Sequence, residues 1–131
     1  MSKIPAEIDT GFKIPEPILW ALDAPVENVM ISEIAHNLDI LYLESEGTDD
    51  WNLTINMLIR NFEKEHHHAD QVNAVDLAFP IELYSYNDKW IILDGVHRLT
   101  KTIMGGKKSL NARKHTRESL GTLIDEYSFI R

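Results

Sequence analysis

The sequence has no cysteine among its 131 residues. This absence excludes thiol nucleophiles, thiolate metal sites and disulfide-stabilised folds. Long hydrophobic runs are missing too, because no stretch approaches the roughly 20 apolar residues that a membrane-spanning helix needs. Residues 1–12 are too polar to form a secretory signal. We therefore expect a cytoplasmic protein that has no contact with a membrane.

The sequence also has few basic residues. Lysine and arginine together number 13, against 21 aspartates and glutamates, which gives a formal net charge of −8. Neutralisation of phosphates supplies most of the non-specific affinity of proteins for duplex DNA, so we do not expect duplex DNA as a partner. One local concentration of positive charge, the basic cluster, is left: Arg98, Lys101, Lys107, Lys108, Arg113 and Lys114.

The length is that of one ordinary domain, and a content of 44% hydrophobic and 26% charged residues is typical of an ordered globular chain. Three of the five prolines lie in residues 1–17, which predicts an extended N-terminal arm followed by one domain over residues 18–131. Two extended pieces are predicted next, over residues 18–22 and 26–34. An acidic loop over residues 36–52 follows them.

Apolar spacing predicts the elements of the second half of the chain. They are a helix over residues 55–62 capped by Thr54, a helix over 69–75, a hairpin with strands over 81–86 and 90–93, a helix over 96–103, a strand over 110–115 and a closing helix over 120–127. Because Trp90-Ile91-Ile92-Leu93 is a continuous apolar run, we predict that this strand is central in its sheet. Gly105-Gly106 is predicted to stop the preceding helix.

The segment Asp94-Gly95-Val96-His97-Arg98 lies between the apolar strand and the helix that follows it. A helix that begins there directs its free backbone N–H groups and the positive end of its dipole outward, toward an anion. His97 and Arg98 fall in its first turn, where an imidazole and a guanidinium can close around a phosphate. Gly95 lets the main chain come close, while Asp94 can orient His97, bind magnesium or cap the helix.

The segment Asp94-Gly95-Val96-His97-Arg98-Leu99 and its surroundings resemble the ParB/sulfiredoxin-like superfamily. The resemblance covers roughly residues 66–115 and includes the hairpin before the motif, the helix ending in Gly-Gly after it, and a strand that carries Arg113. It implies one compact α+β domain of ParB/sulfiredoxin-like type, with a small mixed sheet flanked by helices.

In that superfamily the equivalent helix start binds nucleotide phosphates. Sulfiredoxins use ATP, ParB proteins bind and hydrolyse CTP, and a free-serine kinase branch carries an Asp-Gly-His-His-Arg motif. The resemblance therefore implies a bound nucleotide, ATP, ADP or CTP, with magnesium. Its phosphates would contact Gly95, His97 and Arg98. We add two basic residues of the following helix and strand, Lys101 and Arg113, as further candidate contacts with the nucleotide.

Departures from the superfamily narrow the activity. Sulfiredoxins place their catalytic cysteine directly before the His-Arg pair, where this chain has Val96, so reduction of sulfinic acids is excluded. ParB partition proteins continue into a basic helix-turn-helix region, whereas this sequence ends at Arg131, so we do not expect centromere binding. Over the motif, the kinase branch differs from this chain only in its first His, where this chain has Val96. The resemblance therefore favours a nucleotide-dependent kinase or nucleotide hydrolase, above all phosphoryl transfer to a small hydroxyl substrate.

A phosphotransferase needs a base and usually a magnesium site. The acidic loop offers the carboxylates of Glu44, Glu46, Asp49 and Asp50. Glu44 is the first choice as base because it follows an apolar run that can hold it rigidly, and Asp94 and His97 are the other candidate catalytic residues. Asp49 and Asp50 are the candidate magnesium ligands.

A run of three histidines, His66-His67-His68, precedes Ala69 and Asp70. His66 and Asp70 are spaced i, i+4 and would share a helix face. Consecutive histidines point in different directions, however, and two ligands on one helix do not complete a metal site. We therefore expect this run to lie at the surface or at the edge of a ligand site.

Two other classes of function stay open. A non-catalytic interaction protein would keep the fold and use its acidic surface against a basic partner, and it would be indifferent to Glu44→Ala. A nuclease-like or nucleic-acid-binding domain would need a basic groove, which the basic cluster would have to form. Binding that weakens steeply with salt would identify the second class.

Overall fold

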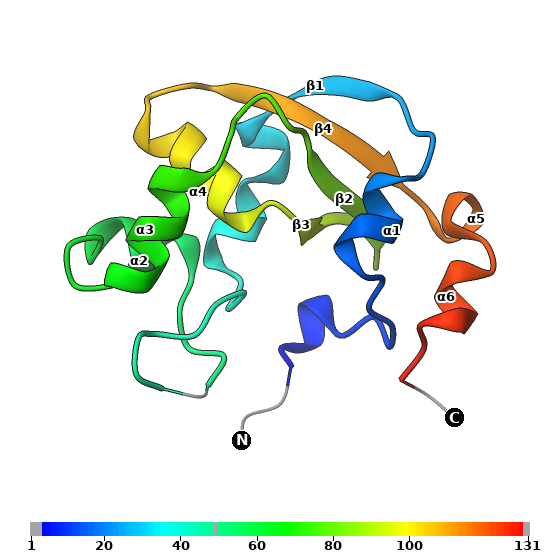
Figure 1. The fold of residues 1–131 in the computed structure, drawn as a ribbon, viewed down its shortest axis with the longest axis horizontal. Coiled ribbons are helices and arrows are strands. Elements are labelled where there is room, and N and C mark those ends of the chain that lie inside the picture. The colour runs from blue at the N-terminus through cyan, green and yellow to red at the C-terminus, as the bar shows by residue number, and fades with distance from the viewer. Residues whose placement is uncertain (1–3, 49, 130–131) are drawn as a thin grey trace.

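A four-stranded mixed sheet separates two groups of helices in the computed structural model (Figure 1), which describes residues 4–48 and 50–129. The strands are β1 (Val26–Met30), β2 (Ile81–Tyr86), β3 (Lys89–Asp94) and β4 (Ser109–His115), in the spatial order β1-β4-β2-β3. Strand β4 pairs antiparallel with β1 and parallel with β2, while β2 and β3 form an antiparallel hairpin. The fold class is therefore α+β, as predicted.

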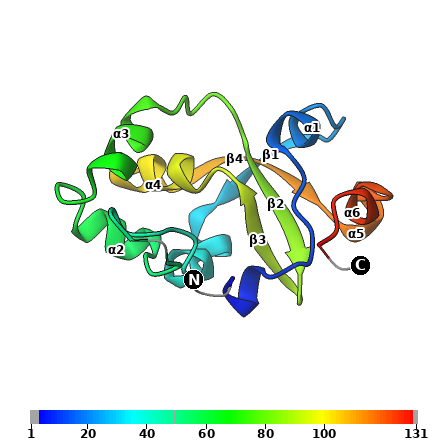
Figure 2. The same ribbon diagram turned by 60° about the horizontal axis from the view of Figure 1, so that its bottom comes forward.

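Helices cover both faces of this sheet. They are η1 (Ala6–Ile8), α1 (Glu16–Trp20), η2 (Ile31–Asp39), α2 (Ile55–Arg60), α3 (His66–Ala74), α4 (Val96–Met104), α5 (Arg117–Leu120) and α6 (Leu123–Glu126). Figure 2 shows α2, α3 and α4 on one side of the strands, and α1, α5 and α6 on the other. None of the helices in residues 4–48 and 50–129 is long and apolar enough to cross a membrane.

Side-chain alternation along β2 and β3 builds one hydrophobic core on each face of the sheet. Leu83 and Ile92 belong to the core that includes residues of η2, α2 and α4, whereas Tyr84 and Ile91 belong to the core that includes residues of α1, α5 and α6. The first core contains Val29, Ile34, Ile55, Ile81, Leu83, Ile92, Leu99 and Ala112. The second contains Phe12, Ile14, Leu19, Tyr84, Ile91, Leu120 and Ile124.

Strand β3 lies at an edge of the sheet, so the prediction that it is central is wrong. Polar side chains satisfy backbone groups of this strand in place of a neighbouring strand. His36 Nε2 and Asn37 Nδ2 donate to the carbonyl oxygen of Trp90 at 2.8 and 2.9 Å. The hydroxyl of Tyr42 accepts the N–H of Ile92 at 2.8 Å. The continuous apolar run of β3 therefore reflects burial on two faces and not a central position.

The described part of the N-terminal segment, for which an extended arm over residues 1–17 was predicted, packs against the body and is partly helical. Phe12 and Ile14 are buried in the second core, and the described part of the segment contains η1 and the start of α1. Pro17 lies in the first turn of α1, where its missing N–H removes no helical hydrogen bond. The prolines of this segment suggested an extended chain, but Pro15 and Pro17 lie at the start of α1.

Two further boundaries differ from the predictions. Residues 18–22 are not extended, because residues 18–20 continue α1, and the piece over residues 26–34 divides into β1 and η2. The closing helix over residues 120–127 is broken into α5 and α6. Gly121 ends α5 with a φ of +57°, a conformation that interrupts an α-helix.

The other predicted elements are confirmed as α2, α3, the β2–β3 hairpin, α4 and β4. Thr54 caps α2 by accepting the N–H of Met57 at 3.0 Å, as expected. Asn87 and Asp88 join β2 to β3 with positive φ values, the backbone of a tight hairpin turn. Helix α4 ends at Met104, directly before the two glycines that were predicted to stop it.

Candidate functional site

The turn from β3 into α4 depends on Gly95. This glycine has a φ of +112°, and a Cβ atom at this position would lie 2.5 Å from Cγ2 of Ile81 and 3.1 Å from its Cα. A side chain here would therefore be strained and would collide with the start of β2. The sequence indicated a glycine for close approach to a ligand, and the structure adds that the turn itself would be strained by any other residue.

A cavity of about 340 Å³ opens at the start of α4. Its lining includes Glu16, Trp20, Asp94, Gly95, His97 and Arg98, and we call it the α4 cleft. No side-chain hydrogen bond from the described residues caps the N-terminus of α4. The structure thus brings three of the predicted phosphate contacts, Gly95, His97 and Arg98, to one cleft beside an uncapped helix start.

Asp94 positions two side chains of this cleft. Its Oδ2 accepts a hydrogen bond from Trp20 Nε1 at 2.8 Å and pairs with an Nη atom of Arg98 at 3.4 Å. Both Asp94 and Arg98 are largely buried. Asp94 therefore does orient side chains, but they are Trp20 and Arg98 and not His97.

Arg98 retains an unused hydrogen-bond donor. Its Nε is buried and has no hydrogen-bond partner among the residues that the structure describes. A buried N–H without a partner costs about 1–3 kcal/mol, so such groups are rare in folded proteins. An acceptor bound beside Arg98 would recover this free energy.

His97 belongs to a chain of hydrogen bonds that passes through His68. Nε2 of His97 lies 3.0 Å from Nδ1 of His68, and Nε2 of His68 lies 2.6 Å from the carbonyl oxygen of Glu44. Because a carbonyl only accepts, His68 donates from Nε2, and a neutral His68 must accept at Nδ1. His97 then donates from Nε2, which leaves its Nδ1 with a free lone pair.

The pKa of His97 is lowered from 6.5 to about 4. Burial is the main cause, repulsion from His68 and His67 adds to it, and the charge of Asp94 opposes it. His97 is therefore neutral at pH 7 in the protein alone. We predicted that this imidazole closes around a phosphate, and the structure makes it a neutral imidazole with one open acceptor nitrogen.

His68 was predicted only to lie, with His66 and His67, at the surface or at the edge of a ligand site, but it is buried. The signal was present in its spacing, since His68 and Val72 are four residues apart on α3 and both are buried. A histidine on the buried face of an amphipathic helix must find a polar partner. The sequence did not show that this partner would be His97.

The acidic loop reaches the site through its backbone. The side chain of Glu44, predicted as the base, is exposed, and the contact that links Glu44 to the histidines is its carbonyl oxygen. Glu65 anchors the next turn of this loop by accepting from the hydroxyl of Ser45 and the N–H of Glu46 at 2.7 and 2.8 Å. Burial opposes the charge of Glu65, but these hydrogen bonds hold its pKa below the usual range.

The predicted magnesium ligands do not form a metal centre in the described residues. Asp49 lies outside the residues that the structure describes, and Asp50 is exposed. No group of three or more His, Asp or Glu side chains in residues 4–48 and 50–129 is arranged to hold a metal ion. His66 instead pairs with Glu46, with Nδ1 3.3 Å from Oε2.

Lys101, predicted to contact phosphate, stabilises the end of α3 instead. Its Nζ donates to the carbonyl oxygens of Asn73 and Val75 at 3.1 and 2.9 Å. These carbonyls belong to the last turn of α3 and the residue after it, where the helix itself supplies no N–H to pair with them. The prediction for Lys101 is therefore not supported by the geometry.

Arg113 also lies away from the α4 cleft. It is buried on β4, where its Nε donates to Glu82 at 2.8 Å and its two Nη atoms donate to the carbonyl oxygens of Leu22 and Leu19. His115 Nε2 lies 2.7 Å from the same carboxylate. Arg113 thus ties the end of α1 and the residues after it to the sheet, and this geometry does not support its predicted contact with phosphate.

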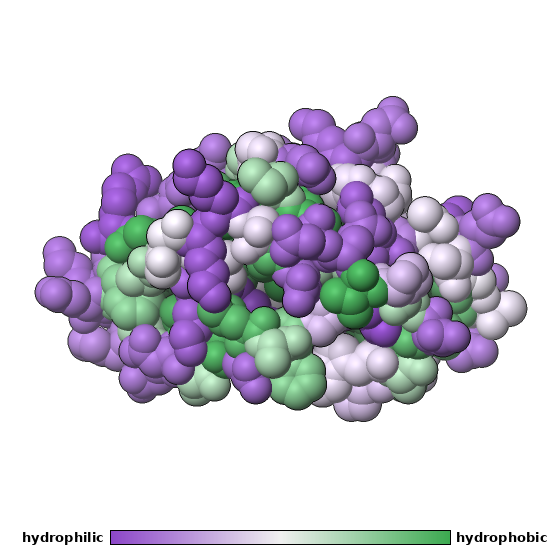
Figure 3. Space-filling view, turned by 90° about the horizontal axis from the view of Figure 1, so that it is seen from above, coloured by the Kyte–Doolittle hydropathy of each residue, from purple (hydrophilic) through white to green (hydrophobic). Residues whose placement is uncertain are grey.

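Four of the six side chains of the basic cluster are engaged by neighbouring groups of the protein. Lys101 and Arg113 are engaged as described, Arg98 pairs with Asp94, and Lys114 Nζ pairs with Glu27 at 2.9 Å. The face of the molecule seen in Figure 3 is a mosaic of hydrophilic and hydrophobic side chains. The cluster therefore does not favour the nucleic-acid-binding alternative.

Comparison of the chain with protein-family models, curated proteins and solved structures finds no match. The function must therefore be inferred from the geometry of the residues themselves.

Proposed function

We propose that the α4 cleft binds the phosphates of a nucleotide, ATP, ADP or CTP, and that the chain is a divergent relative of the ParB/sulfiredoxin-like superfamily. The observation that carries this proposal is the meeting of an uncapped helix start, Gly95 and Arg98 in one cleft, together with a buried Nε–H of Arg98 that has no partner among the described residues. Backbone N–H groups at a helix start and a guanidinium are the usual ligands of phosphate oxygens.

The charges of the cleft favour a phosphate that carries magnesium. Glu16 and Asp94 bring two carboxylates, against the single permanent cation of Arg98. A bare polyphosphate would be repelled by these carboxylates. Magnesium in proteins is usually held by one or two carboxylates together with substrate phosphates, so Asp94 and Glu16 would hold a nucleotide-bound ion. That ion would neutralise phosphate charge, and Arg98 would contact the phosphate oxygens.

The enzymatic form of this proposal is phosphoryl transfer to a small hydroxyl compound, with His97 in place of Glu44 as the base. The hydroxyl oxygen would form a bond to the terminal phosphorus, the bond from that phosphorus to the bridging oxygen would break, and the hydroxyl proton would pass to Nδ1 of His97. The chain of hydrogen bonds from His97 through His68 to the carbonyl oxygen of Glu44 keeps this nitrogen free to accept the proton. A bound anion raises the pKa of a neighbouring imidazole, which makes His97 a stronger base in the complex.

Thermal unfolding with a panel of nucleotides, with and without magnesium, tests the binding proposal. A ligand at about 100 times its Kd stabilises a protein by about 2.7 kcal/mol, or roughly 10 °C in Tm for a domain of this size. We expect such a shift with magnesium and a nucleotide, and a much smaller shift for Arg98→Ala. Lys107→Ala is the matched control, because it removes an exposed positive charge after the other end of α4.

Two results would contradict the proposal. One is the absence of any shift across the panel. The other is an equal shift in the wild-type protein and in Arg98→Ala, since the bound phosphate would then not depend on the α4 cleft.

A further inference from the structure

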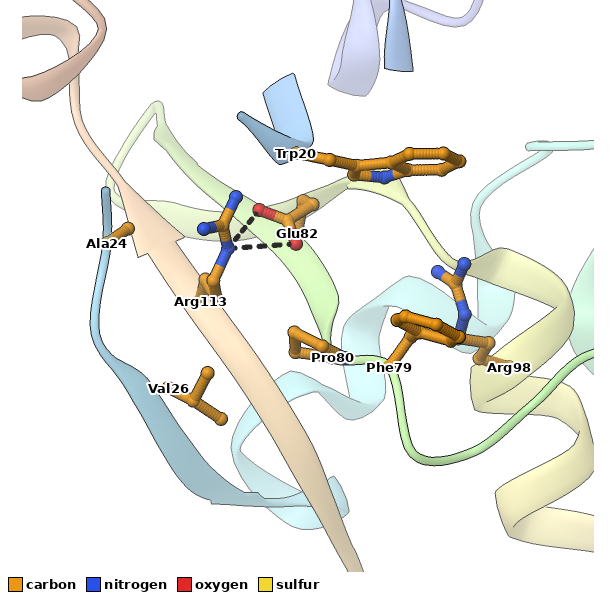
Figure 4. A pocket seen from close by; sticks show the side chains of 8 residues that line it. All are labelled: Trp20, Ala24, Val26, Phe79, Pro80, Glu82, Arg98 and Arg113. Carbon is orange, nitrogen blue, oxygen red and sulfur yellow. Dashed lines mark hydrogen bonds and ion pairs between the residues drawn. The ribbon is translucent and has the colours of Figure 1, made fainter. Parts of the chain in front are cut away.

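A second cavity, of about 420 Å³, lies beside the α4 cleft. Figure 4 shows the indole of Trp20 on one side of it and the ring of Phe79 on the other, with both rings seen nearly edge-on. We call it the aromatic cavity; its lining includes Trp20, Val26, Phe79, Glu82, Arg98 and Arg113. Trp20 is 48% exposed and Phe79 is 62% exposed, although both are large hydrophobic residues. Two exposed aromatic rings around one cavity indicate a binding surface.

The aromatic cavity and the α4 cleft share Trp20 and Arg98. Asp94 holds both of these side chains through one carboxylate oxygen, which fixes their positions relative to each other. One ligand can therefore lie in both cavities, with an anionic end at the start of α4 and an apolar, flat end between the rings. The combined space matches the size of ordinary small-molecule sites.

We propose that the aromatic cavity binds the base of the nucleotide, stacked between Trp20 and Phe79. This inference rests on the proposed function, because it takes the phosphates to lie in the α4 cleft. Every nucleobase has a π face, and stacking on aromatic side chains strengthens binding by about 5- to 150-fold per base. Arg98, at the border of the two cavities, can contact both the ring and the oxygens that join it to the phosphates.

The floor of the aromatic cavity supplies polar groups for the edge of a base. Glu82 and Arg113 are fixed there by their mutual contacts (Figure 4). Each Nη atom of Arg113 carries two N–H groups, and the bonds to the carbonyls of Leu22 and Leu19 use one on each. A few fixed polar groups in an apolar pocket orient a ligand. This arrangement favours a heteroaromatic ring over a purely hydrocarbon ligand, which would leave these groups unpaired.

Calorimetric titration with ligands that differ only in the base tests this inference. The probes are the magnesium complexes of ATP, of CTP and of inorganic tripolyphosphate, which keeps the phosphates and lacks the base. We expect at least one nucleotide to bind about 5- to 150-fold more tightly than tripolyphosphate. Phe79→Ala should remove most of this difference and leave the affinity for tripolyphosphate unchanged. Phe79 is exposed, so its loss should not unfold the protein.

Phe129→Ala is the matched control, since Phe129 is 58% exposed and lies outside the aromatic cavity. Equal affinities for tripolyphosphate and both nucleotides would overturn the base site while leaving phosphate binding intact. Equal losses of all three affinities in Phe79→Ala would also overturn it. If none of the three probes binds, the proposed function itself fails, and the base site fails with it.

Discussion

His68 and His97 lie with their rings stacked, and Nδ1 of His68 is 3.0 Å from Nε2 of His97. Neither sequence separation nor residue type singles out this pair, since one histidine is on α3 and the other is at the start of α4. The carbonyl of Glu44 fixes the direction of both hydrogen bonds. The consequence is a histidine in the candidate site whose tautomer is determined by the fold.

The stability of the protein should fall as the pH falls from about 6.5 to about 4. The pKa of His97 is about 4 in the folded protein and 6.5 without the influence of the fold, so the unfolded chain binds a proton in this window that the folded chain does not. The stabilisation from a neutral His97 is fully present above pH 6.5 and is lost below it. Because the ring is partly exposed, we expect a contribution of about 1–3 kcal/mol. Urea unfolding at a series of pH values measures it.

His97→Gln is the comparison for this experiment. The variant has no imidazole at position 97, so the difference in its unfolding free energy between pH 6.5 and pH 4 should be smaller by that same amount. An identical pH dependence in both proteins would show that His97 is not held neutral by the fold.

His68→Ala should raise the pKa of His97 toward its usual value. The substitution removes the repulsion from His68 and opens the site to water, which are two of the causes that lower the pKa. Nitrogen chemical shifts of the imidazoles, followed against pH, report both the pKa and the tautomer. Glu44→Ala is the control, because it keeps the carbonyl oxygen that His68 uses. If Glu44→Ala changes the His97 tautomer as much as His68→Ala does, the tautomer of His97 is not set by the hydrogen bonds through His68 to the carbonyl of Glu44.

Much of the fold could be predicted because local patterns decide it. Thr54 caps α2 as its residue type indicates, and the glycines after Met104 stop α4. The position of β3 could not be predicted from its apolar run. Burial on two faces produces the same run in an edge strand whose backbone is satisfied by Asn37 and Tyr42. Those partners lie some 50 residues away, and no local pattern reveals them.

The candidate site was predictable where the chain itself brings residues together. Gly95, His97 and Arg98 are neighbours in the sequence, and the start of α4 places them on one cleft. Lys101 and Arg113 were assigned by residue type and proximity, but tertiary contacts with carbonyl oxygens engage both. Arg98 differs from them in that its Nε–H has no hydrogen-bond partner among the described residues, although its Nη pairs with Asp94.

Gly95→Ala should destabilise the protein by about 2–4 kcal/mol, since it adds both a strained positive φ and a collision with Ile81. Gly106→Ala is the matched control. Gly106 has a φ of +74°, and a Cβ atom there would meet no other atom within 4 Å, so only the backbone strain applies, at about 1 kcal/mol. Denaturant unfolding compares the two. Equal losses would show that the turn into α4 tolerates a side chain and that close packing on β2 does not explain the glycine.

Arg113→Met should loosen α1 more than the rest of the molecule. The substitution leaves the buried carboxylate of Glu82 without its guanidinium partner and frees the carbonyls of Leu19 and Leu22, for an expected loss of about 3–5 kcal/mol. Lys114→Met, at the next position, breaks a partly exposed pair with Glu27 and a cation–π contact with Trp90, and should cost no more than about 1–2 kcal/mol. Hydrogen exchange should accelerate over residues 16–22 in the first variant alone. Nucleotide affinity should fall as well, because Trp20 of this segment borders both cavities and Arg113 itself lines the aromatic cavity. Unchanged exchange over residues 16–22 would show that Arg113 does not anchor this helix.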